Sequence, residues 1–564
     1  MISLLSDAVA LLSQWQRYFA DLYSIPTFDL WIWTSAVAAA FLLGHGLRNF
    51  LVFRWRRKLP LVVGGWGSRG KSGTERLKAA LCYSIGLRVV SKTTGCESVF
   101  LYGEFGSPLV EVPLYRPGDK VSIWEHTFTM HMAAAKGVDI FLWECMGLNP
   151  DYVRILQRRW SRDDLSTITN TYPDHEDIQG PTGLDVAETI ANFIPQKAEV
   201  ITTERLMAPV LCREAAKNGS VIECVQPCDV DLFPADILQR YPYAEHPNNI
   251  ALVAALGQKW GYDEDFTYRE TSDHVVPDVG VLKVFPEIDC GGKSVQFSNG
   301  FSANEKLGFM GNWHRLGFAS APLSASTGGE WLVLLVNNRE DRATRARIFA
   351  QFIAHDICLD HIVLVGTGID EFCKAFAKTS RMIGREMWRL LGPGGAENEL
   401  RRRLRLGSDS LIALDSSGER WAEYFRSKVL AIDQLAQKSP LKCMHMIVDK
   451  APDNTKIRIM GTQNIKGFGL AWLQMWQRWE NDGVRNLDLG MSLAREMDLR
   501  WDQSGTMMPK TPFKASPVQL IFDSMKIRRA YRKFIRGQIS ALNLANKLSA
   551  SGPPPVFSKA DQSQ

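Results

Sequence analysis

Short apolar runs, separated by amphipathic stretches, recur along most of the chain. Continuous apolar runs bounded by polar positions are typical of parallel strands that are buried on both faces. We predict such strands at 59–63, 87–91, 137–143, 165–169 and 198–202. Helical spacing of apolar residues predicts helices at 74–81 and 249–259. The pattern indicates an α/β fold with a parallel sheet, and a second α/β block that begins at 330–336 and includes 361–365.

The N-terminal part follows a different pattern. Residues 30–47 carry no formal charge, and their number is near the lower limit for a membrane-spanning helix. Trp31 and Trp33 lie near one end, as interfacial aromatic residues do, and the basic cluster 54–58 follows the other end. We therefore predict a single-pass anchor in the cell membrane, with the rest of the chain in the cytoplasm. The alternative is an amphipathic helix that is buried in a core.

These patterns divide the chain into five segments. We predict an N-terminal membrane anchor at 1–53, a central domain at 54–262 and a C-terminal α/β domain at 330–480. Between the two domains, 263–329 is rich in glycine, proline and polar residues, which suggests a linker or a small irregular module. A C-terminal extension covers 481–564, and its last residues have the composition of a disordered tail.

The composition excludes several classes of protein. A net charge of +5 is small for 564 residues, so it gives no reason to expect a nucleic-acid partner. The ten cysteines are scattered, and Cys224 and Cys228 lack the second pair that a zinc site would need. Neither zinc nor a disulfide framework is indicated, and the pattern fits free thiols in a reducing cytoplasm.

A phosphate-binding pattern lies between the first predicted strand and the first predicted helix. The residues Gly65-Trp-Gly-Ser-Arg-Gly-Lys71-Ser72, called here the phosphate loop, have the spacing of a loop that cradles nucleotide phosphates. Its glycines allow backbone N–H groups to approach the phosphates, Lys71 can reach the terminal phosphates and Ser72 can hold magnesium. We predict a bound nucleoside triphosphate. A chance match in a glycine-containing turn is the alternative. The predicted nucleotide contacts within and next to the loop are Gly65, Gly67, Arg69, Gly70, Lys71, Ser72 and Gly73.

Polar side chains also follow two other predicted strands. Glu144 comes directly after one apolar run, and His175 lies in the run 168–177, which follows another. Because open α/β sheets bind ligands outside the carboxyl ends of their strands, both residues are candidates for a magnesium and phosphate site. Alone, each such residue is more often a hydrogen-bonded turn residue than a ligand, but both follow strands of a sheet that carries a phosphate loop.

The phosphate loop, Glu144 and the Asn170–His175 run together resemble the Mur ligase superfamily of ATP-dependent amide ligases. The resemblance is closest to its membrane-anchored branch, the poly-γ-glutamate synthases of the PgsB/CapB family. It spans about 58–476, and its further motifs are 92–95, 299–304, 337–342 and 461–465. The chain departs from the family in two places, with Glu305 where aspartate is usual and Gln463 where glycine is frequent.

The resemblance implies a Mur-ligase-like central ATPase domain followed by a smaller Rossmann-like domain. It implies that Lys71 and Ser72 bind phosphate and magnesium, that Glu144 holds a first magnesium and that His175 helps to bind a second. By the same resemblance, Asn249 would meet the adenine and Arg342 would close over the nucleotide. The implied catalytic residues are Lys71, Glu144 and His175.

The reaction implied by the family uses ATP and Mg²⁺ to join glutamate units through γ-carboxylates. An acid is phosphorylated to an acyl phosphate, which an amine then attacks. The implied partners are glutamate, the growing poly-γ-glutamate and the membrane subunits of a synthase and export complex. Association into a homo-oligomer is compatible with the family. Three alternatives remain: a Mur-like ligase that adds another amino acid to another acid, a phosphate-loop ATPase or GTPase subunit of a membrane transport complex, and a non-catalytic scaffold.

A basic amphipathic stretch at 526–536 lies near the end of the chain. The stretch is more typical of a solvated helix face, and the alternative is a contact for anionic lipid, an acidic partner or an anionic polymer.

Overall fold

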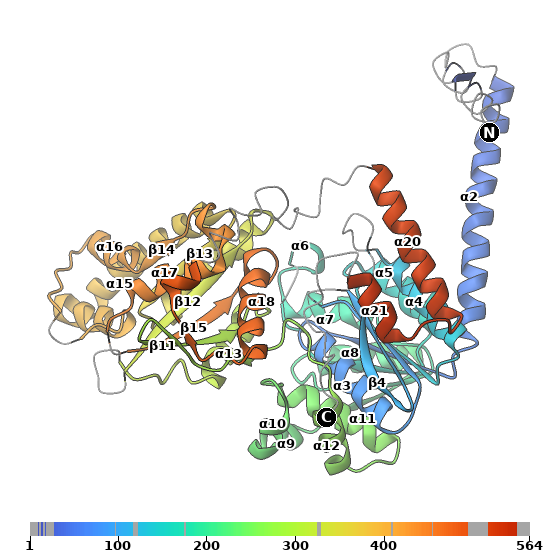
Figure 1. Ribbon diagram of the computed structural model, residues 1–564, viewed down its shortest axis with the longest axis horizontal. Coiled ribbons are helices and arrows are strands. Elements are labelled where there is room, and N and C mark those ends of the chain that lie inside the picture. The colour runs from blue at the N-terminus through green and yellow to red at the C-terminus, as the bar shows by residue number, and fades with distance from the viewer. Residues whose placement is uncertain are drawn as a thin grey trace. The chain divides into compact units, whose positions relative to one another are not determined.

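The computed structural model forms two compact units, Met1–Lys58 and Leu59–Gln564. It describes residues 10, 13, 14, 17, 27–95, 98–114, 116, 122–173, 176–323, 329–407, 410–453, 455–493 and 517–549. Most of the described residues of the first unit lie in one long helix. The second unit contains two β-sheets with their helices (Figure 1).

Helix α2 (Thr27–Arg56) forms the described part of the first unit. It is 30 residues long, its most apolar 18-residue stretch has a mean hydropathy of 1.5, and among the described helices it alone is long and apolar enough to cross a membrane. Val52 is its one buried side chain, so α2 does not fit the alternative of a helix inside a soluble core. Basic residues end the helix, with Arg54 and Arg56 in its last turn.

The first sheet has eight strands in the order β4-β3-β2-β5-β1-β6-β7-β8. All pairs are parallel except β2–β3 and β3–β4, which are antiparallel. Each apolar run predicted in the first half of the chain overlaps one of its strands. The β3–β4 hairpin and β8 are additional to the prediction. The bounds are β1 (Leu61–Trp66), β2 (Val89–Thr93), β3 (Val99–Glu104), β4 (Ser107–Pro113), β5 (Ile140–Glu144), β6 (Leu165–Ile168), β7 (Glu199–Thr202) and β8 (Val221–Cys224).

Helices pack on this sheet, and some of them also pack on one another. Helix α3 (Lys71–Ser84) packs against α11 and α12 through an apolar cluster that includes Leu77, Ile250 and Tyr268. The other helices of this part are α4 (Trp124–Lys136), α5 (Pro150–Arg154), the π-helix η2 (Ile155–Ser161), α6 (Glu176–Gln179), α7 (Gly183–Ala191), α8 (Ala208–Asn218), α9 (Pro227–Asp231), α10 (Ala235–Arg240), α11 (Pro247–Lys259) and α12 (Glu264–His274).

Two consecutive glycines in β1 make room for buried carboxylates. A Cβ on Gly64 would stand 2.0 Å from Asp163 Oδ2, and a Cβ on Gly65 would stand 1.9 Å from Glu75 Oε1. Successive strand residues face opposite sides of a sheet, so the two carboxylates lie on its two faces. Glu75 pairs with the equally buried Lys78 at 2.5 Å. Burial raises the pKa of the Glu75 carboxyl to about 8, and Lys78 acts in the opposite direction.

The second sheet has the order β14-β13-β12-β15-β11-β10-β16, with β9 paired to β11. Its strands are β9 (Lys283–Val284), β10 (Ile288–Cys290), β11 (Lys293–Asn299), β12 (Glu330–Asn338), β13 (His361–Gly366), β14 (Val429–Ala431), β15 (Lys456–Thr462) and β16 (Asn486–Leu487). The helices are α13 (Lys306–Arg315), η3 (Glu340–Arg342), α14 (Ala343–Asp356), α15 (Ile369–Arg403), α16 (Glu419–Ser427), η4 (Ala436–Lys438), α17 (Pro440–Lys450) and α18 (Phe468–Asn481).

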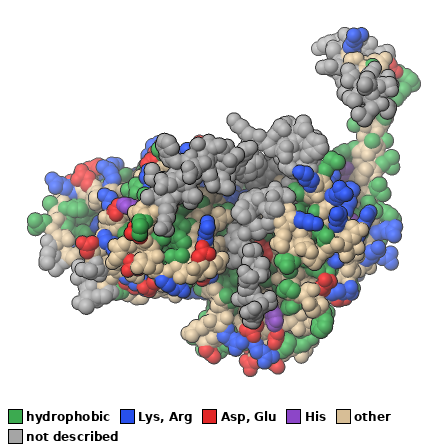
Figure 2. Space-filling view, in the orientation of Figure 1, with side chains coloured by type: hydrophobic (Ala, Val, Ile, Leu, Met, Phe, Trp, Pro, Cys, Tyr) green, Lys and Arg blue, Asp and Glu red, His purple; other side chains and the backbone are tan. Residues whose placement is uncertain are grey.

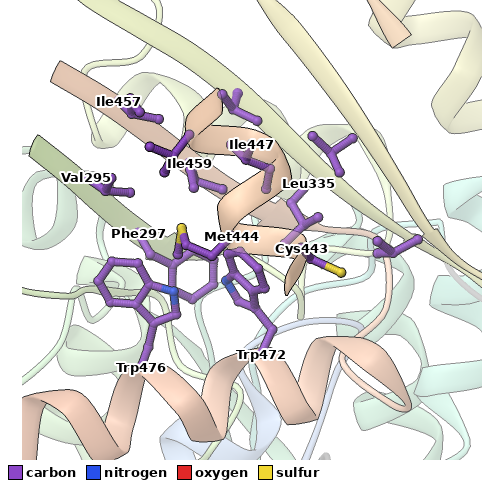
Figure 3. Close-up of a cluster of buried hydrophobic side chains, with 14 of the residues drawn as sticks. Val295, Phe297, Leu335, Cys443, Met444, Ile447, Ile457, Ile459, Trp472 and Trp476 are labelled. Carbon is purple, nitrogen blue, oxygen red and sulfur yellow. The ribbon is translucent and has the colours of Figure 1, made fainter. Parts of the chain in front are cut away.

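Strand β12 shows how this sheet fills a core on each face. Val333 and Leu335 join one apolar cluster, and the alternating residues Leu334 and Val336 join the other. On the first face, Trp472 and Trp476 of α18 lie over Phe297, with Met444 and Ile447 of α17 beside them (Figure 3). Burial on both faces explains the nearly continuous apolar sequence of β12.

The stretch 263–329 differs from the irregular module that its composition suggested. It contains α12, α13 and β9–β11, and β11 pairs in parallel with β15 inside the second sheet. Strands β10 and β11 are joined by Gly291 and Gly292, both in the left-handed region at φ 63° and 85°. The turn glycines and short strands gave a loop-like composition, and the long-range pairing with β15 is not visible locally.

Two helices of the C-terminal extension, α20 (Pro517–Ile535) and α21 (Ala541–Ser549), pack on the first sheet. Tyr531 donates a hydrogen bond to the Pro113 carbonyl at 2.6 Å, and the Phe534 ring lies 5.2 Å from that of Tyr102. Helix α21 packs against β4, which is an edge strand of the first sheet. The basic stretch 526–536 therefore has a buried apolar stripe, and its exposed basic residues are Lys526, Arg528, Arg529, Arg532 and Arg536.

Figure 2 shows basic side chains gathered over the region where Figure 1 places α20. The predicted tail 551–564 lies outside the described residues.

Candidate functional site

The phosphate loop connects β1 to α3, as the sequence predicts. Gly67 and Gly70 have φ of 141° and 81°, and α3 begins at Lys71. The first N–H groups of a helix have no partner within it, so the start of α3 can receive an anion. Lys71 Nζ donates to the carbonyls of Gly67 at 2.7 Å and Ser68 at 3.0 Å. The Lys71 side chain thus lies over the loop, where it is predicted to bind the phosphates of the nucleotide.

The glycines of the loop have different neighbours. A Cβ on Gly67 would stand 2.1 Å from Thr169 Oγ1, and one on Gly70 would stand 2.4 Å from Asn249 Oδ1. Gly73 has more space, with Glu245 Oε2 at 3.3 Å from its Cβ position. Gly65 lies within β1, where its missing side chain accommodates Glu75. The sequence assigned Gly65 to phosphate contact, whereas its surroundings here indicate a packing role.

Asn249 lies at the start of α11, close against the phosphate loop. Its Nδ2 donates to Glu245 Oε1 at 2.8 Å, and the side chain is buried. Asn249, which is predicted to contact adenine, thus lies against the phosphate loop, with its Oδ1 2.4 Å from the Cβ position of Gly70. Its contact with adenine stays a prediction.

The segment after β6 supports the loop through Asn170. Arg69 N–H donates to Asn170 Oδ1 at 2.9 Å, and Asn170 Nδ2 donates to the Arg69 carbonyl at 3.1 Å. The Asn170 carbonyl accepts from Ser68 N–H at 2.9 Å. In this run, the sequence predicted a site role for His175 and none for Asn170. The position of Asn170, a polar residue at the end of a strand, could have indicated its role in holding the loop. His175 lies outside the described residues.

Glu144 and Ser72 form the acidic side of the site. Ser72 Oγ donates to Glu144 Oε2 at 2.8 Å, and Thr94 N–H donates to the same oxygen at 2.6 Å. Glu144 ends β5, which pairs with β1, so the sheet itself brings the two residues together. In the same 92–95 run, the buried Lys92 pairs with Glu125 at 3.5 Å, and burial lowers the pKa of its ammonium.

The donor set of this site suits magnesium held together with a nucleotide. Among the described residues, no group of three or more His, Cys, Asp or Glu side chains forms a complete metal cage. Magnesium at nucleotide sites is usually held by one or two carboxylates together with phosphates and water. A serine hydroxyl beside a buried carboxylate therefore fits the ion, with Ser72 and Glu144 as the residues that would hold it.

The second sheet meets the phosphate loop through the segment after β11. Arg69 pairs with Glu305 at 3.6 Å, and its Nη1 donates to the Ser302 carbonyl at 3.4 Å. Glu305, the departure from the family aspartate, also caps α13 by accepting from the N–H groups of Leu307 and Gly308. The arginine of the loop is therefore bound to both sheets of the unit.

Arg342 lies on η3, directly after β12. Its side chain is half-buried, and its Nε is 4.0 Å from Asp341 Oδ2. Its predicted closure over the nucleotide stays a prediction.

The phosphate loop with its Ser72–Glu144 pair, next to a second α/β sheet, defines the site of a phosphate-loop nucleotide-binding protein. Residues 285–478 match the poly-gamma-glutamate synthase CapB C-terminal domain. The chain is 26% identical to PGA synthase CapB of Bacillus subtilis (strain 168) over 349 residues, which is 61% of this chain and 84% of that protein. It is 26% identical to the capsule biosynthesis protein CapB of Bacillus anthracis over 376 residues, 66% of this chain and 77% of that protein. The chain is thus similar to CapB proteins over 61% to 66% of its length, and its residues 285–478 match a domain of poly-γ-glutamate synthases.

Two kinds of solved structure resemble the chain more distantly. Folylpolyglutamate synthase of Mycobacterium tuberculosis, complexed with ADP and AMPPCP, has a TM-score of 0.47 and 13% identity, covering 77% of this chain and 98% of that one. MurF from Acinetobacter baumannii has a TM-score of 0.45 and 12% identity, covering 76% of this chain and 80% of that one.

Proposed function

We propose that this chain joins glutamate units through their γ-carboxylates into poly-γ-glutamate, using ATP. The observation that carries the proposal is the site at the edge of the first sheet, where Lys71 lies on the phosphate loop, Ser72 donates to Glu144 and Arg69 pairs with Glu305 after β11. The names of the two CapB relatives support the polymer as the product.

The chemistry divides between the nucleotide and the protein. ATP transfers its terminal phosphoryl group to a substrate carboxylate, which yields ADP and an acyl phosphate. The carboxyl carbon of the acyl phosphate is then attacked by an amine. Phosphate leaves as the amide bond forms. A carboxylate by itself is a poor electrophile, so this activation is the step that the site must stabilise.

The residues of the loop act by position and charge. Lys71 is placed to neutralise charge on the transferred phosphoryl group, and the N-terminus of α3 adds backbone donors. Ser72 and Glu144 would hold Mg²⁺, which supplies further neutralising charge when bound. Arg69, tied to Glu305, would help to keep the second sheet over the site, and such closure excludes the water that would hydrolyse an acyl phosphate.

We further propose that α2 anchors the protein in the cell membrane as a single pass, with Arg54, Arg56 and the rest of the chain in the cytoplasm. A ligase that passes an anionic polymer to an export complex gains from such an anchor. Partner subunits in the membrane, and self-association of this chain, belong to the same proposal.

The test is to trap the activated acid. Purified protein is given ATP, magnesium, glutamate or oligo-γ-glutamate, and hydroxylamine, and the hydroxamate of the acid is measured. Lys71→Ala should remove the product, whereas Lys217→Ala, an exposed lysine on α8, should leave it unchanged. Hydrolysis of nucleotide without any dependence on an acid would instead support the transport ATPase alternative.

The amino acid is tested separately. Membranes that contain the full complex should convert radiolabelled glutamate into a high-mass product that a γ-specific hydrolase degrades. Incorporation of another amino acid in place of glutamate would support the alternative Mur-like ligase.

A further inference from the structure

The connection from α12 to β9 runs beside the phosphate loop and is fastened to α3 by a buried arginine. Arg76 Nη1 donates to the carbonyls of Val276 at 2.8 Å and Pro277 at 3.3 Å. Its Nη2 lies 3.5 Å from Asp278 Oδ1, and Nη1 pairs with Glu111 at 2.6 Å. The Arg76 side chain is 1% exposed, so the arrangement is built into the core beneath the loop.

This fastening places one oxygen of Asp278 beside the predicted magnesium ligands. A Cβ built on Gly95 would stand 2.6 Å from Asp278 Oδ2 and 2.9 Å from Ser72 Oγ. The two oxygens therefore flank the same point. Ser72 Oγ in turn donates to Glu144 Oε2 at 2.8 Å. The other oxygen of Asp278, Oδ1, accepts from Val279 N–H at 2.9 Å and faces Arg76.

We infer that Asp278 is a further carboxylate of the magnesium–nucleotide site, supplied by the connection into the second sheet. The inference rests on the proposed ATP-dependent function. The Ser72 hydroxyl, the Glu144 carboxylate to which it donates and the nearby Asp278 carboxylate are oxygen donors of the kind that Mg²⁺ prefers, and one or two carboxylates are usual where phosphates complete the coordination. The Asp278 and Glu144 carboxylates also repel each other electrostatically, and a cation between them removes that repulsion.

The same connection is bound to the second sheet just beyond Asp278. Asn299 Nδ2 donates to the carbonyls of Val279 at 3.1 Å and Val281 at 2.9 Å. Ser302 Oγ donates to the Gly280 carbonyl at 2.6 Å, and the Ser302 carbonyl accepts from Arg69 of the phosphate loop. Magnesium held by Asp278 would therefore fix the position of a segment that is hydrogen-bonded to the end of β11. In this way, occupancy of the metal site is linked to the position of the second sheet.

The test measures binding, not turnover. A fluorescent ATP analogue is titrated into the full-length protein in detergent, without magnesium and then over a range of magnesium concentrations. In Asp278→Asn the magnesium concentration needed for half-maximal enhancement of binding should rise roughly 10- to 100-fold, as for other residues that support a metal site. Affinity for the analogue without magnesium should be unchanged. Asp273→Asn is the control, since Asp273 is an exposed residue of α12 paired with Arg240.

An unchanged magnesium requirement in Asp278→Asn would overturn the inference. So would an equal loss of affinity with and without magnesium, because that result assigns Asp278 only to holding the fold with Arg76. Absence of any nucleotide binding by the unaltered protein would instead refute the proposed function, so the two failures are distinguishable.

A second measurement uses the unaltered protein and does not depend on the folding of a variant. Fe²⁺ replaces Mg²⁺ in the presence of the ATP analogue, and peroxide then cleaves the backbone close to the metal. Mass spectrometry should find cleavage near Ser72, Glu144 and Asp278. Cleavage at the first two without cleavage at Asp278 would exclude the inferred ligand.

Discussion

Replacement of Asn170 by alanine tests whether the segment after β6 holds the phosphate loop in its binding conformation. The substitution removes two hydrogen bonds, from Arg69 N–H and to the Arg69 carbonyl, at a side chain that is 8% exposed. Each such bond contributes about 1 kcal/mol net. The loop conformation should therefore lose about 2 kcal/mol relative to open forms, which corresponds to a nucleotide affinity about 30-fold weaker.

Two assays check this expectation. Equilibrium binding of a fluorescent nucleotide gives the affinity, and hydrogen exchange reports whether the amides of 67–70 become less protected. The control is Asn192→Ala at the end of α7, which removes a comparable set of bonds to Glu188, Thr189 and Arg154. The control should lower the free energy of unfolding without weakening nucleotide binding. Unaltered affinity in Asn170→Ala, or an equal loss in the control, would refute the reasoning.

Three further predictions concern stability and membrane attachment. Gly64→Ala should lower the free energy of unfolding by on the order of 3 kcal/mol in chemical denaturation, because its Cβ would lie 2.0 Å from a buried carboxylate oxygen. Gly311→Ala, in a helix with open space, should be neutral or stabilising, and equal effects would contradict the steric argument. Burial lowers the pKa of His361 to about 4, with Lys428 and Lys450 acting in the same direction. The unfolded chain then binds the proton more tightly, so stability should fall by up to about 3 kcal/mol between pH 6.5 and pH 4. His361→Phe should reduce this fall, whereas the exposed His355→Gln should retain it, and an unchanged pH profile in His361→Phe would reject the assignment. Finally, the protein should stay with membranes in high salt and be released by detergent, because salt does not extract a spanning α2; release by salt alone would indicate peripheral attachment.

The sequence predicted those parts of the site that are built from neighbouring residues. The strand–loop–helix around Lys71 and Ser72 follows from a local apolar run, a glycine pattern and a helical stretch. Glu144 could be added because the carboxyl ends of parallel strands meet at one edge, and β1 and β5 are indeed adjacent. The apolar helix at the N-terminus was likewise visible, since composition over about 20 residues decides it.

Other features were set by contacts between distant residues, and only the tertiary structure decided them. Asn170 supports Arg69 across about 100 positions, and Asp278, from the connection between two sheets, lies with Ser72 beside Gly95. Gly65 fitted the loop pattern, yet the packing of Glu75 against it gives that glycine its role. The residues of β11 look like part of a loop until β15, which lies far along the chain, pairs with them. Local pattern reports which residues can form a strand, helix or turn, whereas the free energy of a buried carboxylate or hydrogen bond depends on partners that are brought together only when the sheets pack.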